Sequence, residues 1–393
     1  MQVPWMTSTP VYAPHPRPGA VAHISQLRGS GAHADADLVE ALATAPQAVW
    51  IEQGTPDEAR VKAASVVAAA AADGSVPVIV VYNLPFRDCS QYSAGGAIDR
   101  SAYEKWVDAV AEGVGDRPAV VILEPDGLGI IPFHTTLNGA REWCEPIDET
   151  GSPQPGASAD DRFAALNHAV DAFASCSEAA VYLDATHSAW LPIGDAAARL
   201  LRAGVERANG FFLNVSNFEF DDDLMRFGTL VSKAVWYASD HGSTGVDALA
   251  EVPHQFGDPN RRDEWFARVV DAHPSFPGIE RLKHFVIDSS RNGRGPWTPP
   301  DVPGEGDAQE WCNPPGRGLG VRSTFAADHP LLDAYLWIKL PGESDGECHR
   351  WTDGPEDPVR RQPCPPAGEW FPELAMELAR GAVPTLDPGT TAS

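Results

Sequence analysis

The chain has 393 residues, of which 55 are acidic and 29 basic, so its formal net charge is −26 at pH 7. Hydrophobic residues make up 43% of it, which indicates a globular protein with a large core. The acidity disfavours nucleic acid, anionic membranes and anionic substrates, so a neutral ligand fits best. No apolar run is long enough to span a membrane, and the first residues lack the pattern of a signal peptide, which says little about secretion.

Short apolar segments alternate with helical patterns along the chain. The predicted strands are Ala48–Ile51, Val78–Tyr82, Ala119–Leu123, Val181–Leu183, Phe211–Val215, His284–Ile287 and Ala334–Ile338. Residues 55–74 combine a threonine cap, an early proline, an alanine-rich body and a final glycine, which predicts a helix between the first two strands. Strands that alternate with helices predict a parallel sheet, and seven of them in one chain favour an α/β barrel over an open sheet.

Polar or aromatic residues follow every predicted strand. They are Trp50, Tyr82, Asp88, Glu124, Asp126, Asp184, His187, Asn214, Asn217, Asp288, Arg291, Lys339, Glu343 and Asp345. One such strand end is ordinary loop chemistry. In an α/β barrel, however, the carboxyl ends of all strands meet at one rim, where active sites lie. The sequence therefore predicts a functional site at this rim.

Asp126 directly follows a buried strand, in the stretch "VVILEPDGLG" (120–129). Burial and a neighbouring carboxylate both raise the pKa of an aspartate, which keeps it protonated and able to act as an acid. Asp88 follows the adjacent strand and is a candidate for that neighbour. Taken alone, the Glu-Pro-Asp sequence would more often be a simple turn at a strand end.

Several of these stretches resemble the motifs of glycoside hydrolase family six, the family of cellobiohydrolases and endoglucanases. They are "VVYNLPFRDC" (80–89), "VVILEPDGLG" (120–129), "VYLDATHSAW" (181–190), "NVSNF" (214–218), "VIDSSRNGRGP" (286–296), "EWCNPPGRGLG" (310–320) and "AYLWIKLPGESDG" (334–346). The resemblance implies a distorted seven-stranded parallel β/α barrel as a single domain. It also implies inverting hydrolysis of β-1,4-glucan, with no metal or organic cofactor. We expect an N-terminal extension at 1–20, the catalytic barrel at 21–384 and a tail at 385–393.

The resemblance also implies roles for single residues. Asp126 matches the general acid, and Asp88 matches the aspartate that keeps this acid protonated and helps to hold the water. Tyr82 matches the tyrosine beneath the distorted sugar ring. Asp345 matches the proposed base, whose role is debated in the family because water can relay the proton. The residues that match sugar-binding or supporting positions are Trp50, Trp190, Trp311, Lys339, Glu343, Asp184, His187, Asn217 and Arg291. Thr186 departs from the family, where glycine is common.

Four of the six cysteines match two disulfides of the family. The first is Cys89–Cys144, which would tie the loop after Asp88 to the loop after Asp126. Cys312 matches one half of the second, and its partner is either Cys348 or Cys364. The spacing to the helix that follows favours Cys312–Cys364. Cys176 is expected to be a small buried thiol. Two disulfides indicate an oxidising compartment, so we expect a secreted protein.

Alternative functions leave different signatures in the sequence. A glucan-binding relative without activity would not need the paired acids Asp88, Asp126 and Asp345. A metal hydrolase using Asp184, His187 and Asp288 lacks the usual ligand spacing. The loop after Asp88 is short and leaves one side of the cleft open, whereas the loop from Asp345 to Cys364 is long. We weigh the short loop more and expect endo action on cellulose and cello-oligosaccharides by a monomer, with cellobiose-releasing exo action as the alternative.

Overall fold

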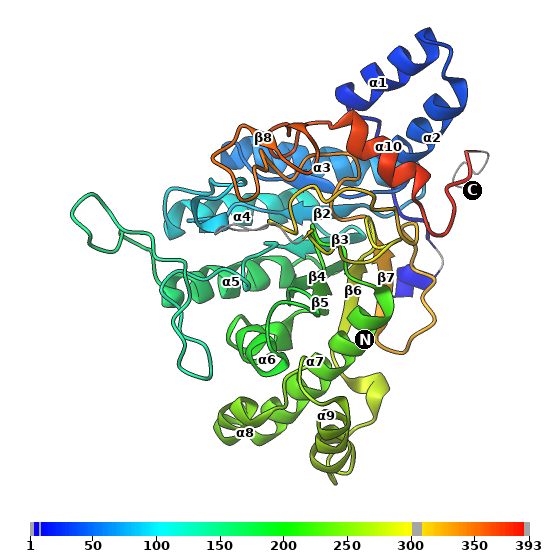
Figure 1. Cartoon of the computed structure of the whole chain (residues 1–393). Coiled ribbons are helices and arrows are strands. Elements are labelled where there is room, and N and C mark those ends of the chain that lie inside the picture. The colour runs from blue at the N-terminus through cyan, green and yellow to red at the C-terminus, as the bar shows by residue number, and fades with distance from the viewer. Residues whose placement is uncertain (1–3, 8, 301–308, 389–393) are drawn as a thin grey trace.

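The computed structural model describes residues 4–7, 9–300 and 309–388. Its main sheet has seven parallel strands that pair in chain order and curl into a distorted α/β barrel (Figure 1). The strands are β1 (Val49–Ile51), β2 (Val78–Val81), β3 (Ala119–Leu123), β4 (Ala179–Asp184), β5 (Gly210–Leu213), β6 (His284–Asp288) and β7 (Leu332–Leu336). All seven predicted strands are confirmed, with ends that differ by no more than two residues. A short hairpin of β8 (Glu356–Asp357) and β9 (Gln362–Pro363) lies outside this sheet.

The described α-helices connect and cover these strands. They are α1 (Pro18–Gly29), α2 (His33–Ala43), α3 (Pro56–Ala72), α4 (Arg100–Val114), α5 (Ala159–Ala174), α6 (Ile193–Arg202), α7 (Asp221–His241), α8 (Ser243–Ala248), α9 (Pro259–Phe266) and α10 (Pro372–Arg380). The predicted helix after β1 begins with a capping box, in which the Thr55 hydroxyl accepts the Glu58 N–H. In Figure 1, α1 and α2 lie at one end of the molecule and α8 and α9 at the other.

The core has two layers because successive strand residues point to opposite faces of the sheet. Val80, Ile122 and Phe212 belong to the inner cluster, which fills the barrel. Ile79 and Val121 belong to the outer cluster, which packs beneath the helices. Side chains that fill the interior make the barrel a packed support and leave its rim for the site.

The first residues of the chain pack against this core. The side chains of Met6 and Val11 belong to the inner cluster of the barrel. The Tyr12 N–H donates to the Val76 carbonyl at 2.8 Å. The limits of the extension, barrel and tail stay a prediction.

The described residues include two disulfides, and one of them differs from the prediction. Cys89 pairs with Cys144, as the resemblance implied. Cys312, however, pairs with Cys348, so the predicted Cys312–Cys364 bond is wrong and Cys364 is a buried thiol. Backbone and side-chain hydrogen bonds between Asn313 and the turn that follows Ser344 bring Cys348 beside Cys312. Spacing along the chain could not indicate this local contact.

No described helix is both long enough and apolar enough to cross a lipid bilayer.

Candidate active site

A cavity of about 860 Å³ opens at the carboxyl ends of the barrel strands. Most of the predicted site residues line it: Trp50, Tyr82, Asp88, Asp126, His187, Trp190, Asn217, Trp311, Lys339, Glu343 and Asp345. Asp184 and Arg291 do not line it: Arg291 binds Asp345, which does, and Asp184 accepts N–H groups of the loop that carries Asp126. The structure thus brings together, at one rim, side chains that are up to 295 positions apart in the chain (345 − 50).

The loop after β3 presents Asp126 to the cavity. Asp126 has a φ of 62°, in the left-handed region that non-glycine residues rarely adopt. One oxygen of Asp184 accepts the N–H groups of Leu128 and Gly129 at 3.2 and 3.1 Å. The guanidinium of Arg162 donates to the carbonyls of Gly127 and Ile130 at 2.9 and 2.7 Å. Side chains therefore bind both N–H and carbonyl groups of this loop, and these hydrogen bonds stabilise its unusual backbone conformation.

The carboxyl group of Asp126 has no hydrogen bond or ion pair with any other described residue. Burial, together with the negative charges of Asp184 and Asp88, raises the pKa of Asp126 well above its ordinary value, against an opposing effect of Lys339. A protonated carboxyl group with a free O–H in a cavity is suited to donate its proton to a bound ligand.

The loop after β2 presents Asp88 and is held by Arg87. The Arg87 guanidinium donates to the carbonyls of Tyr82 and Ser93 at 2.6 and 2.9 Å, so it binds the start and the end of the loop. The Ser93 N–H donates to Asp88 Oδ2 at 2.8 Å. Burial raises the pKa of Asp88 to about 6, although the Ser93 N–H and the Arg87 charge favour its ionised form. Asp88 can therefore gain or lose a proton near neutral pH.

Asp345 has a different environment. Arg291 Nη1 lies 2.9 and 2.8 Å from its two carboxylate oxygens, Lys339 Nζ lies 3.5 Å from Oδ1, and the Asn313 N–H donates to Oδ2 at 2.9 Å. Burial alone would raise the pKa of Asp345, but Arg291 and Lys339 outweigh it and lower the pKa below its ordinary value of 3.8. Asp345 is thus a fixed anion that takes up a proton poorly.

Aromatic rings line the cavity beside these carboxylates. The rings of Trp50 and Tyr82 meet edge to face with centroids 5.3 Å apart, and Trp190 lies 5.7 Å from the imidazole of His187. Trp311 lies 5.8 Å from the ring of Tyr92. Rings fixed in this way offer flat apolar faces on which a ligand can stack.

Comparison with known proteins identifies the family. The family model described as "Glycosyl hydrolases family 6" matches residues 6–382. The chain belongs to glycosyl hydrolase family 6. It is 33% identical over 344 residues to Endoglucanase A from Thermobispora bispora, which covers 87% of this chain and 56% of that protein. It is 27% identical over 376 residues to Exoglucanase-6A from Humicola insolens, which covers 88% of this chain and 67% of that protein.

A solved structure agrees with this family. The endoglucanase Cel6 from Mycobacterium tuberculosis, in complex with methyl-cellobiosyl-4-deoxy-4-thio-β-D-cellobioside, is 32% identical and superposes with a TM-score of 0.66, covering 96% of this chain and 98% of that one. The chain spans 56% of Endoglucanase A from Thermobispora bispora and 57% of Endoglucanase A from Cellulomonas fimi.

Several contacts that support this family 6 site were not predicted from the sequence, although Glu124 itself is one of the strand-end residues named there. Glu124 is fully buried, and its carboxylate accepts the N–H groups of Asn83 and Leu84 at the end of β2. Arg162 and Arg199 donate to carbonyls of the Asp126 loop from helices α5 and α6. No periodic pattern or motif in the sequence indicates these contacts, because each of them joins segments far apart in the chain.

Further cavity residues were missed because they lie on loops. They are Arg17, Glu52, Gln53, Gln91, Trp143, Glu219, Trp297 and Glu310. Trp143 is 56% exposed, and an exposed tryptophan at a cavity edge is a signal that only the structure provides.

The residues of the alternative metal hydrolase do not form a ligand set among the described residues. The carboxylate oxygens of Asp184 accept hydrogen bonds from the N–H groups of Leu128, Gly129 and Thr186. Asp288 likewise accepts backbone N–H groups, including that of Lys339 at 2.9 Å. Carboxylates bound in this way shape the backbone of the site and have few lone pairs left for an ion.

Proposed function

We propose that this chain hydrolyses β-1,4-glucosidic bonds in cellulose and related β-glucans with inversion at the anomeric carbon. The main support is the contrast among three carboxyl groups in one cavity. The pKa of Asp126 is raised well above its ordinary value and its carboxyl group has no partner among the described residues, Asp88 titrates with a pKa of about 6, and Asp345 is held as an anion by Arg291. Membership of family 6 and the names of its endoglucanase and exoglucanase relatives agree with this proposal.

In the proposed reaction, the O–H of Asp126 protonates the glycosidic oxygen as the bond to the anomeric carbon breaks. A water molecule attacks that carbon from the opposite face and loses a proton. Asp88 is the better acceptor for this proton, through a second water, because its Oδ1 has no hydrogen-bonding partner among the described residues and its pKa of about 6 suits a base. Asp345 would orient the attacking water and stabilise positive charge at the anomeric carbon without itself becoming protonated.

The sugar would be held by stacking and by hydrogen bonds. Trp50, Trp190 and Trp311 offer faces for the C–H groups of glucose rings, with Tyr82 beneath the ring at the cleavage point. Lys339 and Glu343 offer charged hydrogen-bonding groups to the hydroxyls, and His187 and Asn217 line the same cavity. Asp184 and Arg291 would act by positioning the Asp126 loop and Asp345. A neutral glucan requires no basic groove, which agrees with the net charge of −26.

Endo action is favoured by the loop after Asp88. This loop folds back on its own strand, since the Ala97 N–H donates to the Asn83 carbonyl at 2.9 Å. A Cβ at Gly96 would lie 1.9 Å from the Leu84 carbonyl oxygen, so glycine permits this close return. A short, folded-back loop cannot cover the cleft from that side. The relatives at 33% identity are named endoglucanases, whereas the exoglucanase is 27% identical.

Two measurements test the proposal. If it is correct, the purified chain lowers the viscosity of carboxymethylcellulose rapidly for each reducing end formed, and proton NMR of cello-oligosaccharide hydrolysis shows α-anomers first. Steady release of cellobiose with little change in viscosity would instead indicate exo action. Initial β-anomers would exclude inversion, and binding of cellulose without release of reducing ends would make the chain a glucan-binding protein.

The protein is also proposed to be extracellular and monomeric. Two disulfides suit an oxidising compartment. Size-exclusion chromatography with light scattering tests the oligomeric state, and a dimer mass would exclude the monomer.

A further inference from the structure

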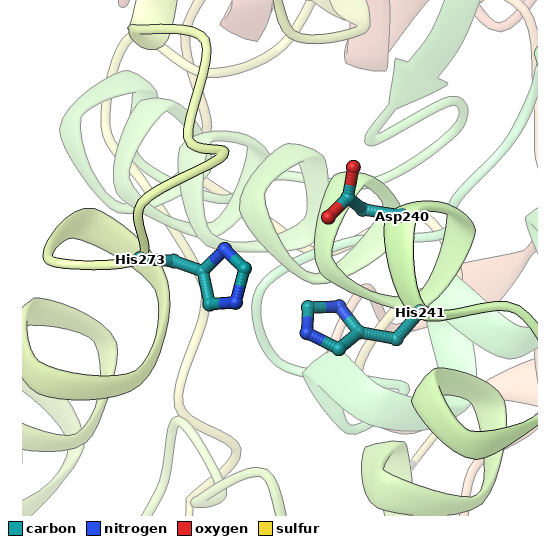
Figure 2. Close-up of side chains that lie close together, drawn as sticks. All are labelled: Asp240, His241 and His273. Carbon is teal, nitrogen blue, oxygen red and sulfur yellow. The ribbon is translucent and has the colours of Figure 1, made fainter.

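A second group of chemically reactive side chains lies away from the cavity. Asp240 and His241 end helix α7, and His273 follows the π-helical segment Ala267–Asp271. One donor atom from each residue lies within 4.8 Å of the others. Figure 2 shows the two imidazole rings facing each other, with the Asp240 carboxylate beside them. None of the three lines the proposed active site.

The imidazole of His241 has a tautomer and an orientation that suit a metal ligand. Its Nδ1 lies 2.8 Å from the Tyr237 carbonyl oxygen one helical turn earlier. A carbonyl can only accept, so Nδ1 carries the hydrogen and Nε2 keeps a lone pair. The ring also packs on that of Tyr237, with centroids 4.4 Å apart. Histidines that bind metals usually donate the other ring N–H to a carbonyl or carboxylate in this way, which fixes the tautomer and the orientation of the ring.

His273 is held less tightly. Its ring lies 4.7 Å from that of His241 at an angle of 69°, and it contacts Trp236 at 5.8 Å. The Ser275 N–H lies 3.3 Å from Nδ1, at the long end of the range for hydrogen bonds. If His273 binds a metal through Nε2, its hydrogen must move to Nδ1, and only the long contact with the Ser275 N–H is lost. If it binds through Nδ1, the metal takes the place of that N–H.

Asp240 completes the set of donors. Its side chain is exposed, and its carboxylate has no hydrogen bond or ion pair with another described residue. The nearby Lys233 is paired with Asp271 at 2.7 Å, so it supplies a cation to a different carboxylate. Two imidazole nitrogens and one carboxylate oxygen suit Zn²⁺, whereas Ca²⁺ and Mg²⁺ prefer oxygen ligands alone.

We propose that Asp240, His241 and His273 form a binding site for Zn²⁺ or a similar divalent transition metal, with solvent water completing the coordination. The ion would join the end of α7 to the segment after α9, across 32 positions (273 − 241) that include α8 and α9. Because these helices lie at one end of the molecule (Figure 1), the ion would stabilise that end and take no part in hydrolysis.

Calorimetry with a matched control tests this site. The protein is purified without a polyhistidine tag, stripped with a chelator and titrated with Zn²⁺, and one ion should bind per chain. His241→Gln and His273→Gln should each weaken this binding by at least about tenfold, and Asp240→Asn should weaken it too. His254→Gln, a histidine between α8 and α9 that lies outside the cluster, should bind Zn²⁺ as the unchanged protein does.

A thermal readout keeps the test independent of activity. Zn²⁺ should raise the Tm of the unchanged protein and of His254→Gln, and should raise that of the three cluster variants less. Asp240→Asn alters an exposed side chain, so it keeps the test valid if a histidine variant does not fold. Absence of stoichiometric binding, equal binding by the cluster variants, or a preference for Ca²⁺ over Zn²⁺ would each overturn the proposal.

Discussion

The assignment of Asp88 as the proton acceptor makes a specific prediction for the acidic limb of the pH profile. Asp88 must be ionised to accept a proton, so kcat/KM falls as the pH drops through its pKa. Burial raises the pKa of Asp88 to about 6, whereas Arg291 and Lys339 outweigh burial at Asp345 and lower its pKa below 3.8. The two candidate acceptors therefore predict acidic limbs in different pH ranges.

The size of the difference follows from these pKa values. At pH 5, a group with a pKa of about 6 is ionised in roughly one molecule in eleven, so kcat/KM should fall to about a tenth of its plateau. A group with a pKa below 3.8 is still more than nine-tenths ionised at pH 5, and rates would hardly change. In Asp88→Asn, the plateau should fall by roughly 10²–10⁴-fold and the limb near pH 6 should vanish from the remaining activity.

The assay is kcat/KM on a soluble cello-oligosaccharide between pH 4 and 8 for the unchanged protein, Asp88→Asn and Asp345→Asn. Asp345→Asn should lose activity, because Arg291 then lacks its buried partner, but should keep the limb near pH 6. The pKa of Asp184 is also raised to about 6 by burial, so a thermal melt at pH 5 must show that the fold is intact. A limb that persists in Asp88→Asn, or disappears in Asp345→Asn, would refute the reasoning.

Three further predictions follow from the same structure. Asp126→Asn should lower the hydrolysis of cello-oligosaccharides by roughly 10²–10⁴-fold but that of an aryl cellobioside much less, since a good leaving group needs no proton; equal losses on both would contradict the acid role. Burial raises the pKa of Glu124 to about 7, so its protonation stabilises the folded state and this stability is lost as the pH rises through 7. Glu219, whose pKa burial also raises to about 7, adds to this effect, whereas His187 and His134, whose pKa values burial lowers to about 4, oppose it increasingly as the pH falls through 6.5. The Tm should therefore rise as the pH falls from 8 to 6.5, and a flat profile would contradict this. Cys364→Ser should leave the free energy of unfolding almost unchanged. The double variant Cys348→Ser with Cys364→Ser should lower it by about 4 kcal/mol, because the Cys312–Cys348 bond closes a loop of 36 positions. An equal loss in the single variant would instead support a Cys312–Cys364 bond.

Most of the fold could be predicted from the sequence because its signals are local. Four or five apolar residues between glycines, prolines and helical patterns indicate a buried strand wherever they pack, as at β3, whose predicted and observed limits coincide. The barrel follows from the number and order of such units. The same reasoning brings polar strand-end residues to one rim, which is why the sequence predicts that Asp88 and Asp126 lie in the site.

The rest of the site could not be predicted because it depends on contacts between distant segments. Nothing in the sequence indicates that Arg291 forms an ion pair with Asp345. This pair is what makes Asp345 a fixed anion, in contrast to the proposed proton acceptor Asp88. The choice between Cys348 and Cys364 had the same difficulty. The sulfur atoms of Cys348 and Cys364 both lie near the buried Asp357, so the fold brings both cysteines into one region and spacing along the chain does not indicate which of them pairs with Cys312.

The loops that carry Asp126, the proposed acid, and Asp88, the proposed acceptor, are joined by other residues. Arg162 Nη1 binds the carbonyls of the Asp126 loop, and its Nη2 donates to the Pro85 carbonyl at 3.0 Å in the loop that leads to Asp88. One buried guanidinium therefore joins the two loops, and the disulfide from Cys89 to Cys144 joins them a second time. A planar group with several fixed N–H donors can satisfy carbonyls from two loops at once, which a lysine ammonium does with less directional control. Because these links bypass the cavity, Asp126 can remain without a hydrogen-bonding partner among the described residues, as the proposed transfer of its proton to a glycosidic oxygen requires.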